Sequence, residues 1–197
     1  MRVLSFLIAI IAIYIPLTAV CDTKDIFMIE SETGQATLVS VKLKSGRVIS
    51  LTNAHMCNDT KFVVAPKATR KLAIVVNQSK IADLCELTSV SDTGYTLSDS
   101  YSKGDAVKVI GYPMSAYKVS SGNLGEYMII RKEEVINGGL FGNLYVNYSG
   151  TVDEGSSGSP ALNSNNEIVG LIALVSQTGR TGKLVPLEFI KQFLGEL

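Results

Sequence analysis

Short apolar segments with an alternating pattern recur along this chain and are separated by turns rich in glycine and asparagine. In the segment 37–43, Val39, Val41 and Leu43 alternate with polar residues, and a Ser-Gly turn separates it from the next segment, 48–51. Such alternation indicates β-strands with one buried face. Further strands are predicted at 62–64, 72–76, 106–111, 126–131, 144–148 and 168–175. Many short strands at regular spacing favour a closed all-β structure.

The carboxyl end of the chain has the pattern of a helix. Pro186 is suited to the helix start, and Glu188 follows in the first turn. The apolar stripe of this helix consists of Leu187, Ile190, Phe193 and Leu194. We expect the stripe to pack on the second half of the molecule, which follows a polar linker at 92–104.

The amino-terminal segment 1–21 has the features of an export signal. Arg2 precedes a run without charge from 3 to 20, with small residues near Ala19. A cleaved signal peptide is the first interpretation, and an uncleaved membrane anchor is an alternative because the run is long enough to span a bilayer. A lipidated Cys21 is a third interpretation, although Val20 is larger than the residue that lipoprotein signals prefer there. Each of the three predicts a folded part outside the cytoplasm, either periplasmic or secreted.

The charge balance excludes several classes of partner. Without Arg2, one of 18 basic residues, the chain keeps 17 basic against 18 acidic residues. Such a balance gives no basic patch for nucleic acid and no acidic run for cationic partners. We therefore predict no nucleic-acid partner, and membrane contact only through the amino-terminal segment, while the oligomeric state stays open.

The hexapeptide Gly-Ser-Ser-Gly-Ser-Pro at 155–160 is a candidate nucleophile loop. Ser157 precedes a glycine, and another glycine lies two residues before it. Glycines allow a sharp bend that brings peptide N–H groups close to a bound carbonyl, which is the arrangement that a nucleophilic serine requires. A Gly/Ser surface turn explains this hexapeptide equally well when it is considered alone.

Two upstream residues favour the catalytic interpretation. His55 is the only histidine of the chain, and Asp83 lies among apolar residues. A nucleophilic serine needs a base, and the imidazole needs a carboxylate that fixes its tautomer. The order His55, Asp83, Ser157 is that of the triads in chymotrypsin-like enzymes.

Four segments resemble the trypsin-like serine peptidases, and most closely the compact bacterial HtrA/Deg-type protease domain. They are Thr-Asn-Ala-His at 52–55, Ala-Asp-Leu at 82–84, Gly-Tyr-Pro at 111–113 and the hexapeptide at 155–160. The resemblance covers 34–185. It implies an all-β fold of two six-stranded antiparallel β-barrels of the chymotrypsin-like type with a C-terminal α-helix.

The resemblance also implies which barrel carries each catalytic residue and which reaction these residues catalyse. A first barrel in 22–100 would carry His55 and Asp83, and a second barrel in 101–197 would carry Ser157. The implied activity is that of a serine endopeptidase that hydrolyses polypeptides through an acyl-enzyme. The N–H groups of Gly155 and Ser157 would form the oxyanion hole, and neither a cofactor nor a metal is expected.

The cysteines suggest a covalent link beside the candidate triad. Cys57 lies two residues after His55, and Cys85 lies two after Asp83. In an exported protein, cysteines that flank residues meeting in space favour a disulfide. Buried free thiols are one alternative, and a zinc site of both cysteines with His55 and Asp83 is another. Cys21 has no obvious partner.

The resemblance locates a substrate pocket. Counting back from the nucleophile puts Thr151 near its floor, so the acidic residue that selects Lys or Arg is missing. The wall would come from Ala173, Leu174 and Val175. Val175 replaces a glycine found in many relatives and would narrow the entrance. We expect cleavage after small or medium uncharged residues.

One further position departs from the digestive and clotting branch of the family. Ser156 stands where that branch has an aspartate that pairs with a newly cut amino terminus. We therefore expect no activation of that kind. Two other functions stay open: a catalytically silent relative that binds peptides or acts as a chaperone, and an esterase that uses the same acyl chemistry.

Overall fold

The computed structural model describes residues 25–30, 32, 34–58, 61–65, 71–129, 144–175 and 181–197. The predicted leader at 1–21, with its alternatives for Cys21, lies outside these residues. Among the helices in the described ranges, none has the length and apolar character needed to cross a membrane.

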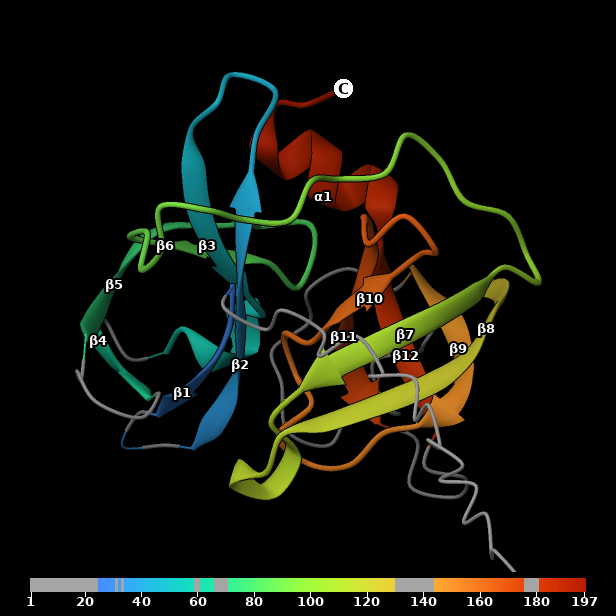
Figure 1. Ribbon diagram of the computed structural model, residues 1–197, viewed down its shortest axis with the longest axis horizontal. Coiled ribbons are helices and arrows are strands. Elements are labelled where there is room, and N and C mark those ends of the chain that lie inside the picture. The colour runs from blue at the N-terminus through green and yellow to red at the C-terminus, as the bar shows by residue number, and fades with distance from the viewer. Residues whose placement is uncertain are drawn as a thin grey trace, which may run out of the picture.

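The first half of the described chain forms a closed barrel, seen on the left in Figure 1. Its strands are β1 (Ile26–Glu30), β2 (Gln35–Lys42), β3 (Val48–Thr52), β4 (Lys61–Ala65), β5 (Lys71–Gln78) and β6 (Cys85–Leu87). They follow one another around the barrel in the order β1-β2-β3-β6-β5-β4, and neighbouring strands are antiparallel. A 3₁₀ turn, η1 (Ala54–Met56), follows β3.

The second half forms another closed barrel from the strands described between 106 and 186. Its strands are β7 (Ala106–Gly111), β8 (Lys118–Ile129), β9 (Leu144–Thr151), β10 (Pro160–Leu162), β11 (Ile168–Val175) and β12 (Thr181–Pro186). Their order is β10-β11-β12-β9-β8-β7, again antiparallel. A second 3₁₀ turn, η2 (Pro113–Ser115), joins β7 to β8. The predicted fold of two six-stranded antiparallel barrels is confirmed.

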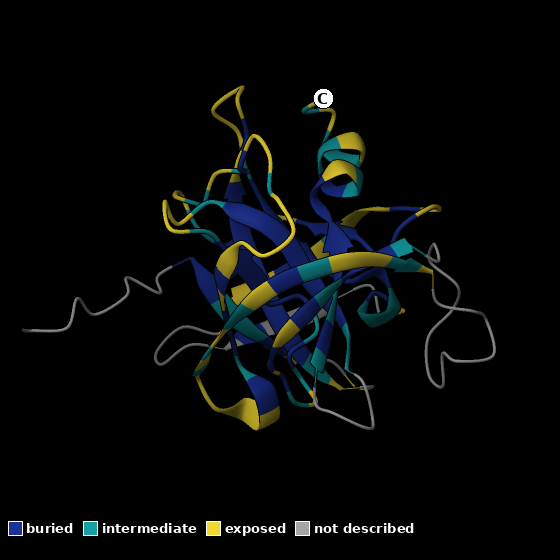
Figure 2. Cartoon of the chain, turned by 90° about the vertical axis from the view of Figure 1, so that its right-hand side faces the viewer, coloured by how far each residue is buried: buried dark blue, intermediate teal, exposed yellow. Residues whose placement is uncertain are grey.

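Three apolar clusters fill the molecule, and one of them belongs to both barrels. Leu38 and Val64 lie in the cluster inside the first barrel, and Val109 and Val146 lie in the cluster inside the second. The third cluster joins residues of the first barrel, such as Leu51, to residues of the second, such as Leu171. Figure 2 shows the buried residues gathered in the strands, while exposed residues lie in the turns, along β8 and on the helix. The barrels therefore share one apolar cluster, and each has a further cluster of its own.

The predicted helix is α1 (Leu187–Leu194), and it packs against β11 and β12 of the second barrel, as expected. Ile190 is fully buried in the shared cluster, and Phe193 and Leu194 pack against it. Gly195 ends the helix with a φ of 69°, a left-handed conformation that favours glycine.

The polar linker at 92–104 is bound to both barrels rather than only connecting them. Tyr95 forms a parallel bridge with Val41, and Leu97 forms one with Ile168. In Figure 1 this segment runs in green from β6 past α1 to β7. Its polar composition predicts a loop but gives no sign of these two bridges.

Several strands were not predicted, for reasons that lie in their sequences. β6 and β10 have three residues each, too few for a pattern to be recognised. β1 and β12 lack clear alternation, and β8 begins at Lys118, well before the predicted 126, because its first half is rich in serine and glycine. Residues 130–131 of the predicted segment lie outside the described residues.

Candidate active site

His55, Asp83 and Ser157 meet where the two barrels face each other. His55 Nδ1 lies 2.7 Å from Asp83 Oδ2, and His55 Nε2 lies 3.2 Å from Ser157 Oγ. The three side chains therefore form one continuous chain of contacts. Asp83 is 3 % exposed, whereas His55 is partly exposed.

The pairing of β3 with β6 explains why the histidine and the aspartate meet. These strands are antiparallel, and Thr52 at the end of β3 pairs with Cys85 at the start of β6. The residues that follow β3 and those that precede β6 therefore lie at the same end of the sheet. His55 is in η1, just after β3, and Asp83 is in the turn before β6.

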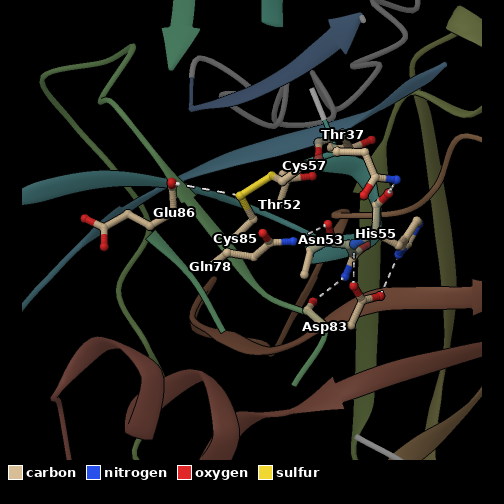
Figure 3. The surroundings of a disulfide bond; sticks show 11 residues. Thr37, Thr52, Asn53, His55, Cys57, Gln78, Asp83, Cys85 and Glu86 are labelled. Carbon is tan, nitrogen blue, oxygen red and sulfur yellow. Dashed lines mark hydrogen bonds and ion pairs between the residues drawn. A yellow bond between two sulfur atoms is a disulfide. The ribbon is translucent and has the colours of Figure 1, made fainter. Parts of the chain in front are cut away.

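Asp83 holds the histidine at two atoms. Its Oδ1 accepts a hydrogen bond from the backbone N–H of His55 at 2.9 Å, while Oδ2 faces Nδ1. An ionised carboxylate is an acceptor, so it favours the tautomer with hydrogen on Nδ1. Nε2 is then free to accept the Ser157 proton. Figure 3 shows this pair, with Asn53 Nδ2 donating to the Asp83 carbonyl at 3.0 Å.

Tyr145 of β9 is a neighbour of Asp83 that the sequence analysis did not identify. It is buried in the core shared by the barrels. Burial, and secondarily the negative charge of Asp83, raise the pKa of Tyr145 to about 12. The phenol therefore stays neutral beside the carboxylate over the physiological pH range. An aromatic residue in a strand pattern gives no signal for such a position.

The nucleophile loop needs both of its glycines. Gly155 and Gly158 have φ values of 85° and 81°, in the left-handed region where glycine is favoured. A Cβ on Gly158 would lie 2.0 Å from the carbonyl oxygen of Thr37. This distance is too short for any side chain at position 158. The positive φ values explain both glycines, and close packing against the first barrel is a second reason for Gly158.

The two predicted oxyanion donors have fixed peptide planes. The Glu154 carbonyl accepts a hydrogen bond from Met114 N–H at 3.1 Å, and the Ser156 carbonyl accepts one from Ser159 N–H at 2.9 Å. In a trans peptide the N–H points opposite to the C=O. The N–H groups of Gly155 and Ser157 therefore point away from these partners, and neither donates to another residue of the described chain. Sequence reasoning missed Met114.

The predicted pocket residues differ in how far their side chains are buried. Ala173 is buried and Val175 partly buried, both on β11. Thr151 is exposed at the end of β9, so its side chain faces solvent. The next residue, Val152, is 2 % exposed and packs in the second barrel with Ile172. Strand alternation explains the difference, because adjacent residues point to opposite sides.

Ile172 connects this apolar group to the nucleophile loop. Its carbonyl accepts a hydrogen bond from Gly158 N–H at 2.8 Å, and its N–H donates to the Ser159 carbonyl at 2.9 Å. On the facing strand, a Cβ on Gly182 would lie 2.7 Å from Ile172 Cδ1 and 3.3 Å from Val152 Cγ2. The core of the second barrel next to the nucleophile loop is therefore tightly packed and apolar.

The predicted disulfide between Cys57 and Cys85 is confirmed, with the two Cα atoms 6.5 Å apart. It joins the end of η1 to the start of β6, beside the histidine and the aspartate (Figure 3). Since both sulfur atoms are bonded to each other, the thiolates required by the zinc alternative are not available. No group of three or more potential metal ligands gathers among the described residues.

Solved structures with this arrangement of strands are proteases. The active form of the Rv3671c protease of M. tuberculosis superposes with a TM-score of 0.72 at 17% identity, over 87% of this chain and 80% of that one. A serine protease of a human pathogenic astrovirus gives 0.61 at 19% identity, over 82% and 88%. The fold is that of the chymotrypsin-like serine proteases.

A third structure with the chymotrypsin-like fold contains a bound peptide. The HtrA-type protease AlgW with a tripeptide superposes with a TM-score of 0.67 at 18% identity over 87% of this chain. The present chain spans 59% of the AlgW chain. A comparison with the known protein families gives no match.

We predict that the disulfide contributes a measurable part of the free energy of unfolding. Replacing both cysteines, Cys57→Ala with Cys85→Ala, should lower the free energy of unfolding by about 3–4 kcal/mol, because the bridge closes a loop of 28 residues in the unfolded chain. Urea unfolding measures this loss. In the full-length chain, which keeps residue 21, Cys21→Ala is the matched control and should leave the midpoint unchanged. An unaltered midpoint in the double variant would contradict the structural role of the bridge.

The raised pKa of Tyr145 predicts that the folded protein loses stability at high pH. An unfolded tyrosine ionises near 10.0, whereas folded Tyr145 keeps its proton to about 12. The folded state therefore binds the proton more tightly, and the free energy of unfolding falls as the pH rises between these values. Relative to Tyr145→Phe, the wild type should lose about 2–3 kcal/mol over this range. Equal pH dependence of the two proteins in urea titrations would rule this out, and Tyr117→Phe, with its exposed ring, is the control.

Proposed function

We propose that this protein is an exported, trypsin-like serine endopeptidase that hydrolyses polypeptides through an acyl-enzyme on Ser157. The observation that carries the proposal is the continuous contact from Asp83 through His55 to Ser157 within a chymotrypsin-like fold. The contacts between these residues and the buried position of the carboxylate are those that nucleophilic catalysis by serine requires. Their order along the chain is that of the chymotrypsin-like triads.

The reaction begins with attack of Ser157 Oγ on the substrate carbonyl carbon. His55 Nε2 takes the serine proton, and the positive charge that develops on the ring is stabilised by Asp83. The negative charge that develops on the carbonyl oxygen is stabilised by the N–H groups of Gly155 and Ser157. His55 then gives its proton to the leaving amine, which breaks the peptide bond. Water then attacks the acyl-enzyme with His55 as the base, which releases the carboxylic acid product and restores the Ser157 hydroxyl.

The oxyanion loop supports activity without a new amino terminus. Ser156 is buried, its N–H donates to the Asp153 carbonyl at 3.1 Å, and its Oγ accepts from Asp153 N–H at 3.3 Å. The loop is thus closed by its own neutral hydrogen bonds. No buried charge at position 156 requires an amino terminus as partner, so export and folding are sufficient for activity.

The surroundings of the nucleophile loop support a preference for small or medium uncharged residues. Val152 and Ile172 make the core next to the loop apolar, and Val175 is the last residue of the strand that carries Ile172. The nearby carboxylate of Asp153 forms an ion pair with Lys118. Its charge is thereby offset and does not attract a basic substrate side chain.

Export is proposed from the leader and is supported by the disulfide, since such bonds persist in oxidising compartments. A polypeptide substrate is supported by the peptide bound to AlgW.

Labelling with a fluorophosphonate tests the proposed mechanism. Mass spectrometry of the folded protein should find one adduct, on Ser157. His55→Ala should slow labelling by about four orders of magnitude or more, because the base is lost. Asp83→Asn should slow it by on the order of 10⁴-fold, because the His55 ring is no longer held in the tautomer with hydrogen on Nδ1. Ser157→Ala is the control for other reactive sites. A folded wild type that takes no label would support the silent peptide-binding alternative, and turnover of esters but not peptides would support the esterase.

A peptide library tests the preference. Cleavage should follow small or medium uncharged residues, and Val175→Gly should extend it to larger side chains because the branched side chain narrows the entrance. Thr181→Ala, on the neighbouring strand, is the matched control and should leave the preference unchanged. Efficient cleavage after arginine would refute the proposed specificity.

A further inference from the structure

Thr37 of β2 links the first barrel to the nucleophile loop of the second. It is 0 % exposed, although it is a polar residue on the first barrel. Its backbone N–H donates a hydrogen bond to the carbonyl of Ser157 at 2.8 Å. The strand of one barrel therefore binds the nucleophile residue of the other directly.

The side chain of Thr37 adds three contacts around one hydroxyl group. Thr37 Oγ1 accepts hydrogen bonds from Tyr112 N–H at 3.0 Å and from Ser159 Oγ at 3.1 Å. It donates a longer one, of 3.5 Å, to the carbonyl of Gly155. A threonine hydroxyl has one hydrogen and two lone pairs, so these contacts use all of them.

The neighbouring backbone is shaped to admit this hydroxyl. A Cβ on Gly111 would lie 1.9 Å from Ser159 Oγ and 2.7 Å from Thr37 Oγ1. Glycine at the end of β7 thus leaves room for the two side chains to meet. The contact with Ser159 is buried and the other two are partly buried, and a buried hydrogen bond fixes its partners more firmly than one that competes with water.

The partners of Thr37 are residues of the proposed oxyanion hole. Its N–H holds the carbonyl of Ser157, and its hydroxyl holds the carbonyl of Gly155. The predicted oxyanion donors are the N–H groups of these same two residues. Because oxyanion donors act only within a narrow range of distance to the developing charge, any group that fixes this backbone sets their efficiency.

We propose that the Thr37 hydroxyl is a positioning group for the oxyanion hole. It acts from the first barrel and contacts no substrate. It keeps the loop 155–159 at the position where the N–H groups of Gly155 and Ser157 converge. This inference rests on the proposed serine-hydrolase function.

Three variants of the full-length protein test the role of the hydroxyl. Thr37→Val keeps the shape and removes the oxygen, and Thr37→Ser keeps the oxygen. Ser50→Ala is the control, because Ser50 is equally buried on β3 and its hydroxyl accepts a hydrogen bond from Val90 N–H at 3.3 Å rather than contacting the loop. The measurements are the rate of fluorophosphonate labelling, kcat and KM for p-nitrophenyl acetate, and the urea midpoint.

Thr37→Val should lower kcat and the labelling rate of the folded protein by about tenfold to a hundredfold, as small misplacements in active sites do. KM and the midpoint of the pH profile should stay unchanged, because His55 and Asp83 are not disturbed. Thr37→Ser should restore the rate, and Ser50→Ala should keep it. If Thr37→Val does not fold, Ser159→Ala removes one contact of the hydroxyl and should give a smaller loss in the same direction.

Each other outcome overturns the inference. A Thr37→Val protein that loses stability but labels as fast as Ser50→Ala would show a structural role alone, as would a Ser159→Ala protein with the wild-type rate. A shifted pH profile would show that the histidine is disturbed instead. A folded wild type that takes no label would overturn the proposed function itself, and this result is distinct because it does not depend on the variants.

Discussion

The apolar packing between the two barrels is the interaction on which the candidate site depends. Ser157 comes from the second barrel, and its base and carboxylate come from the first, so their 3.2 Å contact exists only while the barrels stay together. The shared cluster that contains Leu51 and Leu171 provides this cohesion without specifying direction. Direction comes from hydrogen bonds that cross the boundary, among them those of Thr37. Hydrophobic packing brings the halves together, and polar contacts set their register.

Backbone geometry performs much of the chemistry that the site is proposed to carry. Glycines at positive φ make the nucleophile loop, and hydrogen-bonded carbonyls of Glu154 and Ser156 aim the N–H groups on the other side of each peptide. These donors are oriented before any substrate arrives, so little reorganisation accompanies the reaction. The side chains of the loop matter less for the developing charge than the positions of its peptide planes.

Sequence reasoning identified the fold class, the disulfide and three residues that meet in space, because each leaves a local pattern. His55 and Asp83 lie beside strand ends, and the Gly-Ser motif marks a tight loop. Thr37 and Met114 could not be found in this way. Their roles arise from contacts with residues more than thirty positions away, and nothing in their own surroundings in sequence signals them. Val152 was missed because the register of a strand end decides which of two neighbours faces inward.

The linker 92–104, which bridges both barrels through Tyr95 and Leu97, determines what cleavage of the chain between the barrels would do. A nick in this segment would break the covalent connection between the barrels, but the shared apolar cluster and the hydrogen bonds of Thr37 would still hold them together. His55 and Asp83 lie before the segment in the chain and Ser157 lies after it, so the proposed catalytic residues would stay in contact in a nicked molecule.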